Sequence, residues 1–478
     1  MKIIKNYIYN LSYQLLVLIL PFVTIPYISR IFGPRGVGSY AVSYSIAHYF
    51  TVVGLLGINT YGARQIAYSR DNKEECDKTF WNLNYMRIIT MSIVAVLYIV
   101  YVMFGVGIEK KALYIAQGFT LAASFFDVSW YFAGMEEFKI TAVRNMLVKL
   151  VGVILVFIFI KTEEDVWLYA LILSLSLLIG QLAVWNIIFR QIRFERPEKN
   201  RIAKYMKESF KLWIPAIAIN IYASLDKVML GYMIDDVEAG IYENTQKAIK
   251  MVSTVTTTFA TVMTPRMSNL FHNRNIASIK ENVYKSFKFV TFLAVPMVFG
   301  VIAVRKTFVP WFYGEEFGKI SGLLIVSAWL VLTLSWSNVL GNQVLIACNK
   351  EKYYTLAVLT SAVINLLFNA ILIPIITSYG AIIASVISEY VGMFIMMYCS
   401  RDVIRPLVLL KGIAHYFMAA LIMFFISCYV GECMGATVIA TFVQIVVGVL
   451  IYCFMMFLCK DEIMLKMIDI IRVNKEKQ

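Results

Sequence analysis

Residues 33–64 read GPRGVGSYAVSYSIAHYFTVVGLLGINTYGAR, and this stretch decides how the chain is interpreted. It contains one apolar span that begins at Gly38 and is expected to end at Arg64. The glycine, tyrosine and arginine that mark the span recur at a constant offset of 202 residues, as Gly240, Tyr242 and Arg266. The recurrence predicts that the chain is built from two related halves.

The polar positions inside the two spans also correspond. Tyr44, His48, Thr51 and Asn59 of the first span align with Gln246, Lys250, Ser253 and Thr261 of the second. Most are three or four residues apart, which places them on one face of a helix. Two matching helices with polar stripes predict two halves that line one aqueous cavity.

The composition identifies a polytopic membrane protein. Of the 478 residues, 60% are hydrophobic and only 15% are charged, and the mean hydropathy is +0.72. Apolar runs of about 20 residues, long enough to cross a bilayer, recur along the whole chain. The net charge of +14 lies mainly in short loops and does not indicate nucleic-acid binding. The seven cysteines have no metal-ligand spacing, and a disulfide framework is not expected.

The apolar runs predict an all-α fold with about fourteen transmembrane helices. The spans are expected at residues 7–29, 38–62, 80–104, 111–134, 140–160, 166–189, 209–233, 240–265, 286–306, 320–346, 353–375, 379–400, 411–430 and 435–459. When residues at span edges are counted with the adjoining loop, one set of loops carries 30 Lys and Arg and the other carries 8. This asymmetry predicts a multi-pass protein of the cytoplasmic membrane with both termini in the cytoplasm.

The longest connection, residues 190–208, is basic and contains Pro197. It separates six spans from the next six, so we expect an N-terminal lobe at residues 1–189, a cytoplasmic linker at 190–208 and a C-terminal lobe at 209–400. Residues 401–478 are expected to form an additional pair of helices and a cytoplasmic tail. An even number of spans in each half makes the repeat parallel.

Six basic residues fall inside the predicted spans, where each costs about 2.5–3.5 kcal/mol near the bilayer centre. They are Arg87, Arg144, Lys149, Lys227, Lys247 and Lys250. We expect Arg87 and Arg144 to reach the nearby cytoplasmic surface with their long side chains. Glu243 and Lys247 form a favourable i,i+4 pair, which leaves Lys250 without a local acid.

The basic side chains outnumber the in-span acids, which are Asp127, Asp226, Glu243 and Glu389. The surplus predicts a cavity for an anionic ligand, although interhelical ion pairs and lipid headgroups are the alternative. Asp127, Asp226 and Glu389 are candidates for binding a coupling ion, and each can equally be the partner of a buried cation. The sequence has no Walker A motif, metal-ligand cluster or catalytic triad, so neither a cofactor nor an enzyme is expected.

Several stretches resemble the Wzx-type polysaccharide flippases of the multidrug/oligosaccharidyl-lipid/polysaccharide exporter superfamily. The similarity covers most of residues 1–400, and Gln65 and Ile383 depart from the usual pattern. The stretches are IPYISRIFGPRGVGSYAVS (25–43), GINTYGARQIA (57–67), LDKVMLGYM (225–233), GIYENTQKA (240–248), TPRMSNL (264–270) and SYGAIIASVISEY (378–390).

The resemblance implies a V-shaped molecule with two six-helix lobes and two extra helices. It also implies that alternating access carries an undecaprenyl-pyrophosphate-linked oligosaccharide repeat unit, for O-antigen or capsule synthesis, from the inner to the outer leaflet. Its partners would be the polysaccharide polymerase and chain-length proteins. The positions that match the family motifs, and would bind the substrate, are Arg30, Arg64, Lys227, Lys247 and Arg266. Lys149 and Lys250 are added because of their depth and helix face, and Arg64 and Arg266 could instead gate the cavity.

Three alternatives remain open. A cation-coupled multidrug exporter of the same superfamily would be expected to have an acidic cavity, but the first span contains no Asp or Glu. A membrane polysaccharide polymerase or ligase usually has large outer loops, and here the outer loops are short. A flippase for peptidoglycan precursors is a close relative that the sequence does not separate from the first interpretation.

Overall fold

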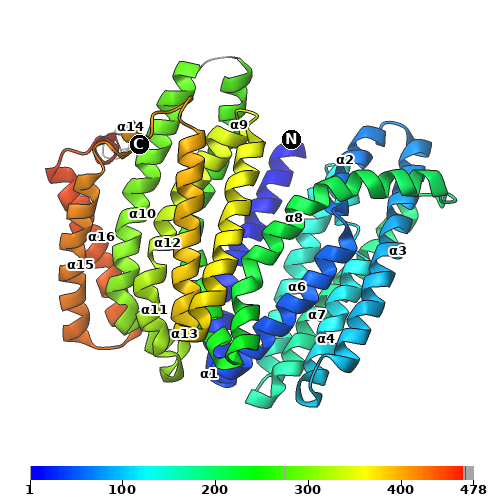
Figure 1. The fold of residues 1–478 in the computed structure, drawn as a ribbon, viewed down its shortest axis with the longest axis horizontal. Helices are drawn as coiled ribbons and strands as arrows, with labels where there is room; N and C mark the ends of the chain where they lie inside the picture. Colours follow the sequence, from blue (N-terminus) through cyan, green and yellow to red (C-terminus); the bar gives the residue numbers. More distant parts are fainter. Residues whose placement is uncertain (1, 274–275, 467–468, 470–478) are drawn as a thin grey trace. The chain divides into compact units, whose positions relative to one another are not determined.

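The computed structural model describes residues 2–273, 276–466 and 469, and most of the predicted C-terminal tail lies outside these residues. The described chain is helical and contains no strand, which confirms the all-α prediction. It divides into two compact units, Met1–Gly240 and Ile241–Gln478, and Figure 1 shows the helices of each. The lobe boundaries that we expect from the linker remain predictions.

The first unit contains eight helices and the start of a ninth. Its first helix is interrupted at Gly33 (φ 59°, ψ −177°), a left-handed conformation that glycine adopts at little cost. Two of the predicted spans therefore lie in one element. The helices are α1 (Lys2–Leu55), α2 (Ile58–Ser69), α3 (Lys73–Phe104), α4 (Ile108–Phe125), α5 (Ser129–Gly134), α6 (Phe138–Phe159), α7 (Val166–Gln191) and α8 (Lys199–Met233), followed by α9 (Asp236–His272).

The second unit contains a broken helix of the same kind. α13 (Glu351–Cys399) is interrupted at Ile376 and Thr377 and folds back on itself. The close contact between its two halves shows this fold, since a Cβ added to Gly392 would lie 2.1 Å from the Ser361 hydroxyl. Beyond α9, this unit contains α10 (Ile276–Tyr313), α11 (Lys319–Ser327), α12 (Trp329–Asn338), a π-helix (Val339–Ile346), α13 (Glu351–Cys399), α14 (Pro406–Leu410), α15 (Ala414–Met434) and α16 (Val438–Leu458).

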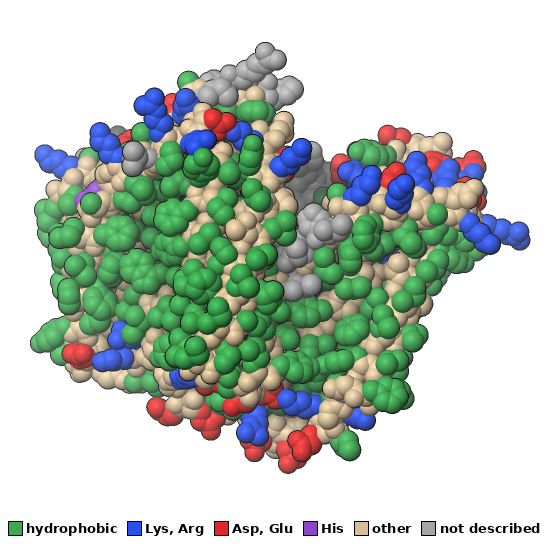
Figure 2. All heavy atoms as spheres, in the orientation of Figure 1, with side chains coloured by type: hydrophobic (Ala, Val, Ile, Leu, Met, Phe, Trp, Pro, Cys, Tyr) green, Lys and Arg blue, Asp and Glu red, His purple; other side chains and the backbone are tan. Residues whose placement is uncertain are grey.

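The helices account for the predicted membrane spans. Nine helical segments of the described chain are long and apolar enough to cross a membrane, and two of them, in α1 and α13, contain two predicted spans each. The remaining three spans lie on α4, α8 and α9. Apolar side chains cover the middle of the helices in Figure 2, and charged side chains gather near their ends.

The structure corrects three predicted boundaries. The second span ends at Leu55, because Leu56 and Gly57 both adopt positive φ and start a separate helix. The fourth span is interrupted between Phe125 and Ser129, where α4 ends and α5 begins. Part of the predicted linker is helical, since α8 begins at Lys199 and continues without a break into the seventh span.

The two C-terminal helices pack on α10 of the second unit. Trp311 on α10 donates its indole N–H to Thr441 on α16 at 2.8 Å. Tyr452 on α16 donates its hydroxyl to the Phe292 carbonyl on α10 at 2.9 Å. The predicted appended pair is therefore attached to its unit by hydrogen bonds as well as by apolar contacts.

A buried carboxylate connects the ends of these helices. Asp461 follows α16, and its carboxylate accepts hydrogen bonds from Tyr416 Oη at 2.9 Å and His415 Nε2 at 3.1 Å. Burial alone would raise the pKa of Asp461, but these bonds and two backbone N–H groups outweigh it and lower the pKa. The carboxylate is therefore ionised at neutral pH, and it holds the start of α15 against the end of α16.

Gly38 and Gly240, the repeat glycines, are in direct contact. A Cβ on Gly38 would lie 1.7 Å from the Asp236 carbonyl oxygen, and one on Gly240 would lie 2.0 Å from the Pro34 carbonyl oxygen. Beside them, the Asp236 carboxylate accepts a hydrogen bond from Ser39 and pairs with Lys110, both at 2.5 Å. The glycines predicted from the 202-residue offset thus permit the closest backbone approach between α1 and the start of α9.

We predict that Gly38→Val destabilises the protein by about 2 kcal/mol, because the new side chain would collide with backbone that cannot move aside cheaply. The melting midpoint of the purified protein, followed by intrinsic fluorescence, should fall by several degrees. The matched control is Gly300→Val, because nothing lies within 4 Å of a Cβ at that helical position. Equal midpoints for the two variants would contradict the close approach.

Candidate functional site

An aromatic ladder follows the polar face of α1 in the first unit. The rings of Tyr40 and Tyr44 are stacked with their centroids 6.0 Å apart, and the rings of Tyr44 and His48 are stacked at the same distance. His48 Nε2 lies 3.2 Å from Asn220 Oδ1 on α8. The predicted stripe of α1 therefore meets the helix that carries Asp226 and Lys227.

Not every position of the predicted stripes is accessible. Thr51 and its repeat counterpart Ser253 are both buried, and each donates its hydroxyl to the carbonyl four residues earlier. Tyr44 is 39% exposed, and Lys250 is also exposed. Thr51 and Ser253 thus share the same environment, but the candidate contact surface in each helix is narrower than the sequence pattern predicts.

Asp226 and Lys227 occupy the polar part of α8. Asp226 is buried, at 8% exposure, and Lys227 is half-buried. Tyr49 on α1 hydrogen-bonds Ser224 and lies close enough to Asp226 to interact with it electrostatically. This part of α8 therefore places a carboxylate and an ammonium group in adjacent positions next to the α1 stripe.

The two arginines taken from the N-terminal motifs lie far apart. Arg30 is exposed and precedes the break at Gly33, whereas Arg64 is exposed on α2, beyond the end of the second span. The helix between them, residues 34–55, is roughly 30 Å long. Arg64 lies over the Tyr61 ring, 5.7 Å from its centroid. The first unit does not bring Arg30 and Arg64 together at one anion site.

Arg87 contradicts the sequence-based prediction. Its side chain is 1% exposed, so it does not reach the surface. It donates hydrogen bonds to the Asp127 carbonyl and to Asn84 Oδ1. The Asp127 carbonyl belongs to the interruption between α4 and α5, so Arg87 supplies a partner for backbone that has left the helix. Sequence reasoning missed this role because the partner is 40 residues away.

Asp127 and Arg144 extend this buried network. The Asp127 carboxylate accepts from the backbone N–H and the hydroxyl of Ser129, at 2.9 and 2.5 Å. Arg144, also predicted to reach the surface, is half-buried and donates to Ser129 at 3.1 Å and Gln181 at 2.7 Å. Asp127 therefore has a structural role at the start of α5, and its role as a coupling-ion ligand stays a prediction.

Lys149 is half-buried near the middle of α6, and its role in substrate binding stays a prediction. Arg30, Lys149 and Lys227 each have an intramolecular contact. Among the described residues, no cluster of three or more His, Cys, Asp or Glu side chains could hold a metal ion.

The three candidate substrate-binding cations of the second unit, Lys247, Lys250 and Arg266, lie on α9. The predicted pair of Glu243 and Lys247 is confirmed, with Oε1 and Nζ 3.3 Å apart. Lys250, one turn further, is exposed and has no side-chain partner among the described residues. Arg266 is also exposed and lies roughly 24 Å further along the helix. α9 thus carries two neighbouring lysines and a distant arginine.

Polar side chains next to the lysines connect α9 to α13. Gln246 donates to Tyr242 Oη at 2.9 Å, and that hydroxyl lies 3.2 Å from Ser385 Oγ. Glu389, one turn after Ser385, is half-buried and interacts electrostatically with Tyr354 across the α13 hairpin. Neither Glu389 nor Asp226 is tested as a coupling-ion ligand, and both remain predictions.

Long apolar helices that carry polar stripes and cations define a multi-pass membrane protein of the transporter class. A model of the family described as polysaccharide biosynthesis protein matches residues 3–271, more than half of the chain. The chain therefore belongs to this family. The match confirms the predicted resemblance to the Wzx-type flippases of the multidrug/oligosaccharidyl-lipid/polysaccharide exporter superfamily.

Curated relatives and solved structures agree with this assignment. A putative O-antigen transporter of Escherichia coli (strain K12) is 20% identical over 402 residues, which cover 83% of this chain and 96% of the relative. The lipid II flippase MurJ of Bacillus subtilis (strain 168) is 23% identical over 224 residues, 44% of this chain and 41% of that protein. A structure of lipid II flippase MurJ in an inward closed conformation superposes with a TM-score of 0.78 at 15% identity, covering 96% of this chain and all of that one, and confirms the fold.

We predict that Arg87→Met lowers the free energy of unfolding by about 3 kcal/mol or more, because it removes two hydrogen bonds from a charged donor. The buried Asn84 Oδ1 loses that donor, and the Asp127 carbonyl keeps only the Trp130 indole N–H. Thermal unfolding of the purified protein measures the loss. Arg87→Lys should recover part of it, since an ammonium group satisfies fewer acceptors than a guanidinium. Arg196→Met is the control, because Arg196 is exposed and has no side-chain partner in the described part of the chain. A similar midpoint for Arg87→Met and Arg196→Met would contradict a structural role for Arg87.

Proposed function

We propose that the protein is a flippase that moves an undecaprenyl-pyrophosphate-linked oligosaccharide repeat unit from the inner to the outer leaflet of the cytoplasmic membrane. Both termini are cytoplasmic in this proposal, and transport follows alternating access. The protein does not catalyse a reaction, and its product passes to a polysaccharide polymerase and its chain-length proteins. The family match and the putative O-antigen transporter among the relatives support this class of substrate.

The observation that carries the proposal is Lys250. An ammonium group on a membrane-spanning helix is costly unless water or an anion compensates it. Lys247 has the Glu243 carboxylate 3.3 Å away, whereas Lys250 has no such partner among the described residues. A pyrophosphate group would compensate Lys250 and could share Lys247 with Glu243.

Neighbouring groups on α9 favour a ligand that also carries sugars. Thr258 is exposed and Thr254 is half-buried, and each donates its hydroxyl to the carbonyl four residues earlier. Their oxygens remain available as acceptors for sugar hydroxyls. In the first unit, the stacked Tyr40, Tyr44 and His48 offer flat ring surfaces. We propose that the lysines hold the pyrophosphate and that the α9 hydroxyls contact the oligosaccharide, while the rings of the first unit offer a separate surface for sugars.

The other cations have positions that suit successive stages of transport. Arg30 and Arg64 flank the second half of α1, with Arg30 before the break at Gly33 and Arg64 on α2, and Arg266 lies far from Lys250 along α9. We propose that Arg64 and Arg266 attract or gate the substrate at the cytoplasmic mouth, and that Lys149 and Lys227 contribute to binding deeper in the membrane. Arg30 would contact the substrate near the outer leaflet.

We predict that Lys250→Ala reduces flipping at least about tenfold, because one charge-assisted contact to phosphate contributes about 1.5–3 kcal/mol. The assay uses cells that lack the chromosomal gene but keep the polymerase, and it measures undecaprenyl-pyrophosphate oligosaccharide on the cytoplasmic leaflet. The wild-type gene should relieve the accumulation and Lys250→Ala should not. Lys250→Arg should retain activity because it keeps the charge.

Lys411→Ala is the matched control, since Lys411 is an exposed lysine of the second unit outside α9. Full relief by both Lys250→Ala and Arg266→Ala would overturn the assignment of these residues and leave the flippase standing. If the lipid does not accumulate without the protein and sensitivity to cationic drugs changes instead, the multidrug-exporter alternative is correct.

A further inference from the structure

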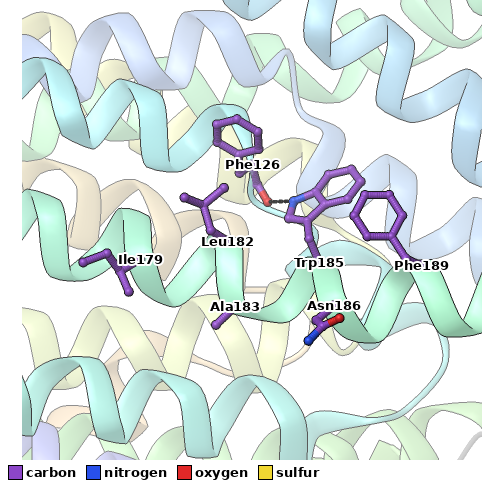
Figure 3. A pocket seen from close by; sticks show the side chains of 7 residues that line it. All are labelled: Phe126, Ile179, Leu182, Ala183, Trp185, Asn186 and Phe189. Carbon is purple, nitrogen blue, oxygen red and sulfur yellow. Dashed lines mark hydrogen bonds between the residues drawn. The ribbon is translucent and has the colours of Figure 1, made fainter.

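The outer surface of α7 in the first unit carries an apolar groove that the transport proposal does not use. Its volume is about 750 Å³, within the range of small-molecule pockets. Six of its seven lining side chains are apolar, and Asn186 is the exception. Ile179 and Phe189 are 59% and 66% exposed, so the groove opens away from the core of its own unit. Figure 3 shows these side chains along one face of α7, with Phe126 opposite them.

Aromatic contacts hold one end of the groove in shape. Trp185 donates its indole N–H to the Phe126 carbonyl at 2.8 Å, just after the end of α4 (Figure 3). The Trp185 ring lies 5.5 Å from the Phe189 ring and 6.2 Å from the buried Phe80 ring. The indole is thus fixed by a hydrogen bond and by packing, and the groove is formed without a ligand.

Basic side chains follow the groove along the chain. Ile179, Ala183, Asn186 and Arg190 are spaced by four, three and four residues, so Arg190 continues the lining face by one turn. The segment after α7 contains Arg193 and Arg196. Trp81, next to Phe80, donates its indole N–H to the Arg193 carbonyl at 2.8 Å and packs on Phe194 at 4.9 Å. These contacts keep the segment beside the aromatic end of the groove.

No acidic side chain of the described residues pairs with these arginines. Arg190, Arg193 and Arg196 are exposed, and none has a side-chain partner among the described residues. The acids nearby in the sequence are engaged elsewhere. Glu198 pairs with Arg201 at 3.2 Å, and Glu195 interacts electrostatically with Lys78. The positive charge of Arg190 also interacts favourably with the free carbonyl groups at the end of α7. Arg193 and Arg196 lie beyond the helix and have no such interaction.

We propose that this groove binds one anionic phospholipid, with an acyl chain along α7 and the phosphate against Arg190, Arg193 and Arg196. The apolar lining matches a hydrocarbon chain, and the unpaired guanidinium groups match a phosphodiester. Trp185 lies between them, where tryptophan is favoured at a membrane interface. The lining offers only Asn186 as a polar side chain, so it has no set of partners for sugar hydroxyls. A phospholipid therefore fits better than the transported oligosaccharide lipid.

The test measures fluorescence quenching of Trp185 in the full-length protein reconstituted in phosphatidylcholine vesicles. A small, equal fraction of brominated phosphatidylglycerol or brominated phosphatidylcholine is added, and the signal of a Trp185→Phe variant is subtracted. The anionic lipid should quench Trp185 at least about fivefold more effectively than phosphatidylcholine. This factor is the gain in binding expected from a single arginine near an anionic lipid headgroup. Equal quenching by the two lipids would overturn the proposal and indicate bulk lipid only.

Two triple variants separate a specific site from the general positive charge. Arg190→Gln/Arg193→Gln/Arg196→Gln should abolish the preference for phosphatidylglycerol. Lys199→Gln/Lys204→Gln/Lys207→Gln removes the same charge from exposed positions on α8 and should leave the preference unchanged. A loss in the lysine variant and not in the arginine variant would refute the assignment.

A second measurement identifies the occupant without relying on tryptophan. Native mass spectrometry should show one retained phosphatidylglycerol on the wild type and on the lysine variant, and none on the arginine variant. Ala183→Trp, which fills the groove from the exposed face of α7, should also remove it. Displacement of the phospholipid by an equimolar polyprenyl pyrophosphate would overturn the choice of occupant and assign the groove to the tail of the transported lipid.

Discussion

The constraint on which the rest of this structure depends is that backbone N–H and C=O groups inside a bilayer must find partners within the protein. Helices satisfy this requirement, so the important positions are those where a helix stops. Between α4 and α5, the buried Arg87 reaches the Asp127 carbonyl and Asp127 accepts from Ser129. A charged side chain that looks costly in the membrane is thus retained because it completes the hydrogen bonding of an interrupted helix.

The same constraint explains which features could be predicted from the sequence. The all-α fold and the Glu243–Lys247 pair follow from local periodicity, and the structure confirms both. The sequence pattern predicts too late an end for the second span, because Ile58 and Tyr61 continue the apolar pattern although Leu56 and Gly57 turn the chain. The prediction that Arg87 reaches the surface is wrong because its partner, the Asp127 carbonyl, is distant in the sequence. Local pattern determines the helices, but tertiary contacts determine what a buried charge does.

The candidate site could be predicted only in part for a related reason. Helical spacing placed Tyr44 and Thr51 on one stripe, yet Tyr44 is exposed and Thr51 is buried. Tyr44 and Thr51 are one heptad apart and differ by only about 20° around the helix axis, yet neighbouring helices cover Thr51. A sequence pattern identifies a face, whereas the packing of adjacent helices decides how wide the accessible part of that face is. The repeat shows this rule twice, since Ser253 is buried like Thr51.

The paired and unpaired lysines of α9 show how one helix can combine folding with recognition. The Glu243 carboxylate offsets the charge of Lys247 within the helix, which lowers the cost of placing an ammonium group in the membrane. Lys250 has no such compensation among the described residues, so its environment must supply it. Water can do so at every stage, but an anionic ligand does so only while it is bound. In the proposed flippase, this difference between the two lysines would allow α9 to bind an anion reversibly without a buried, permanently unpaired charge.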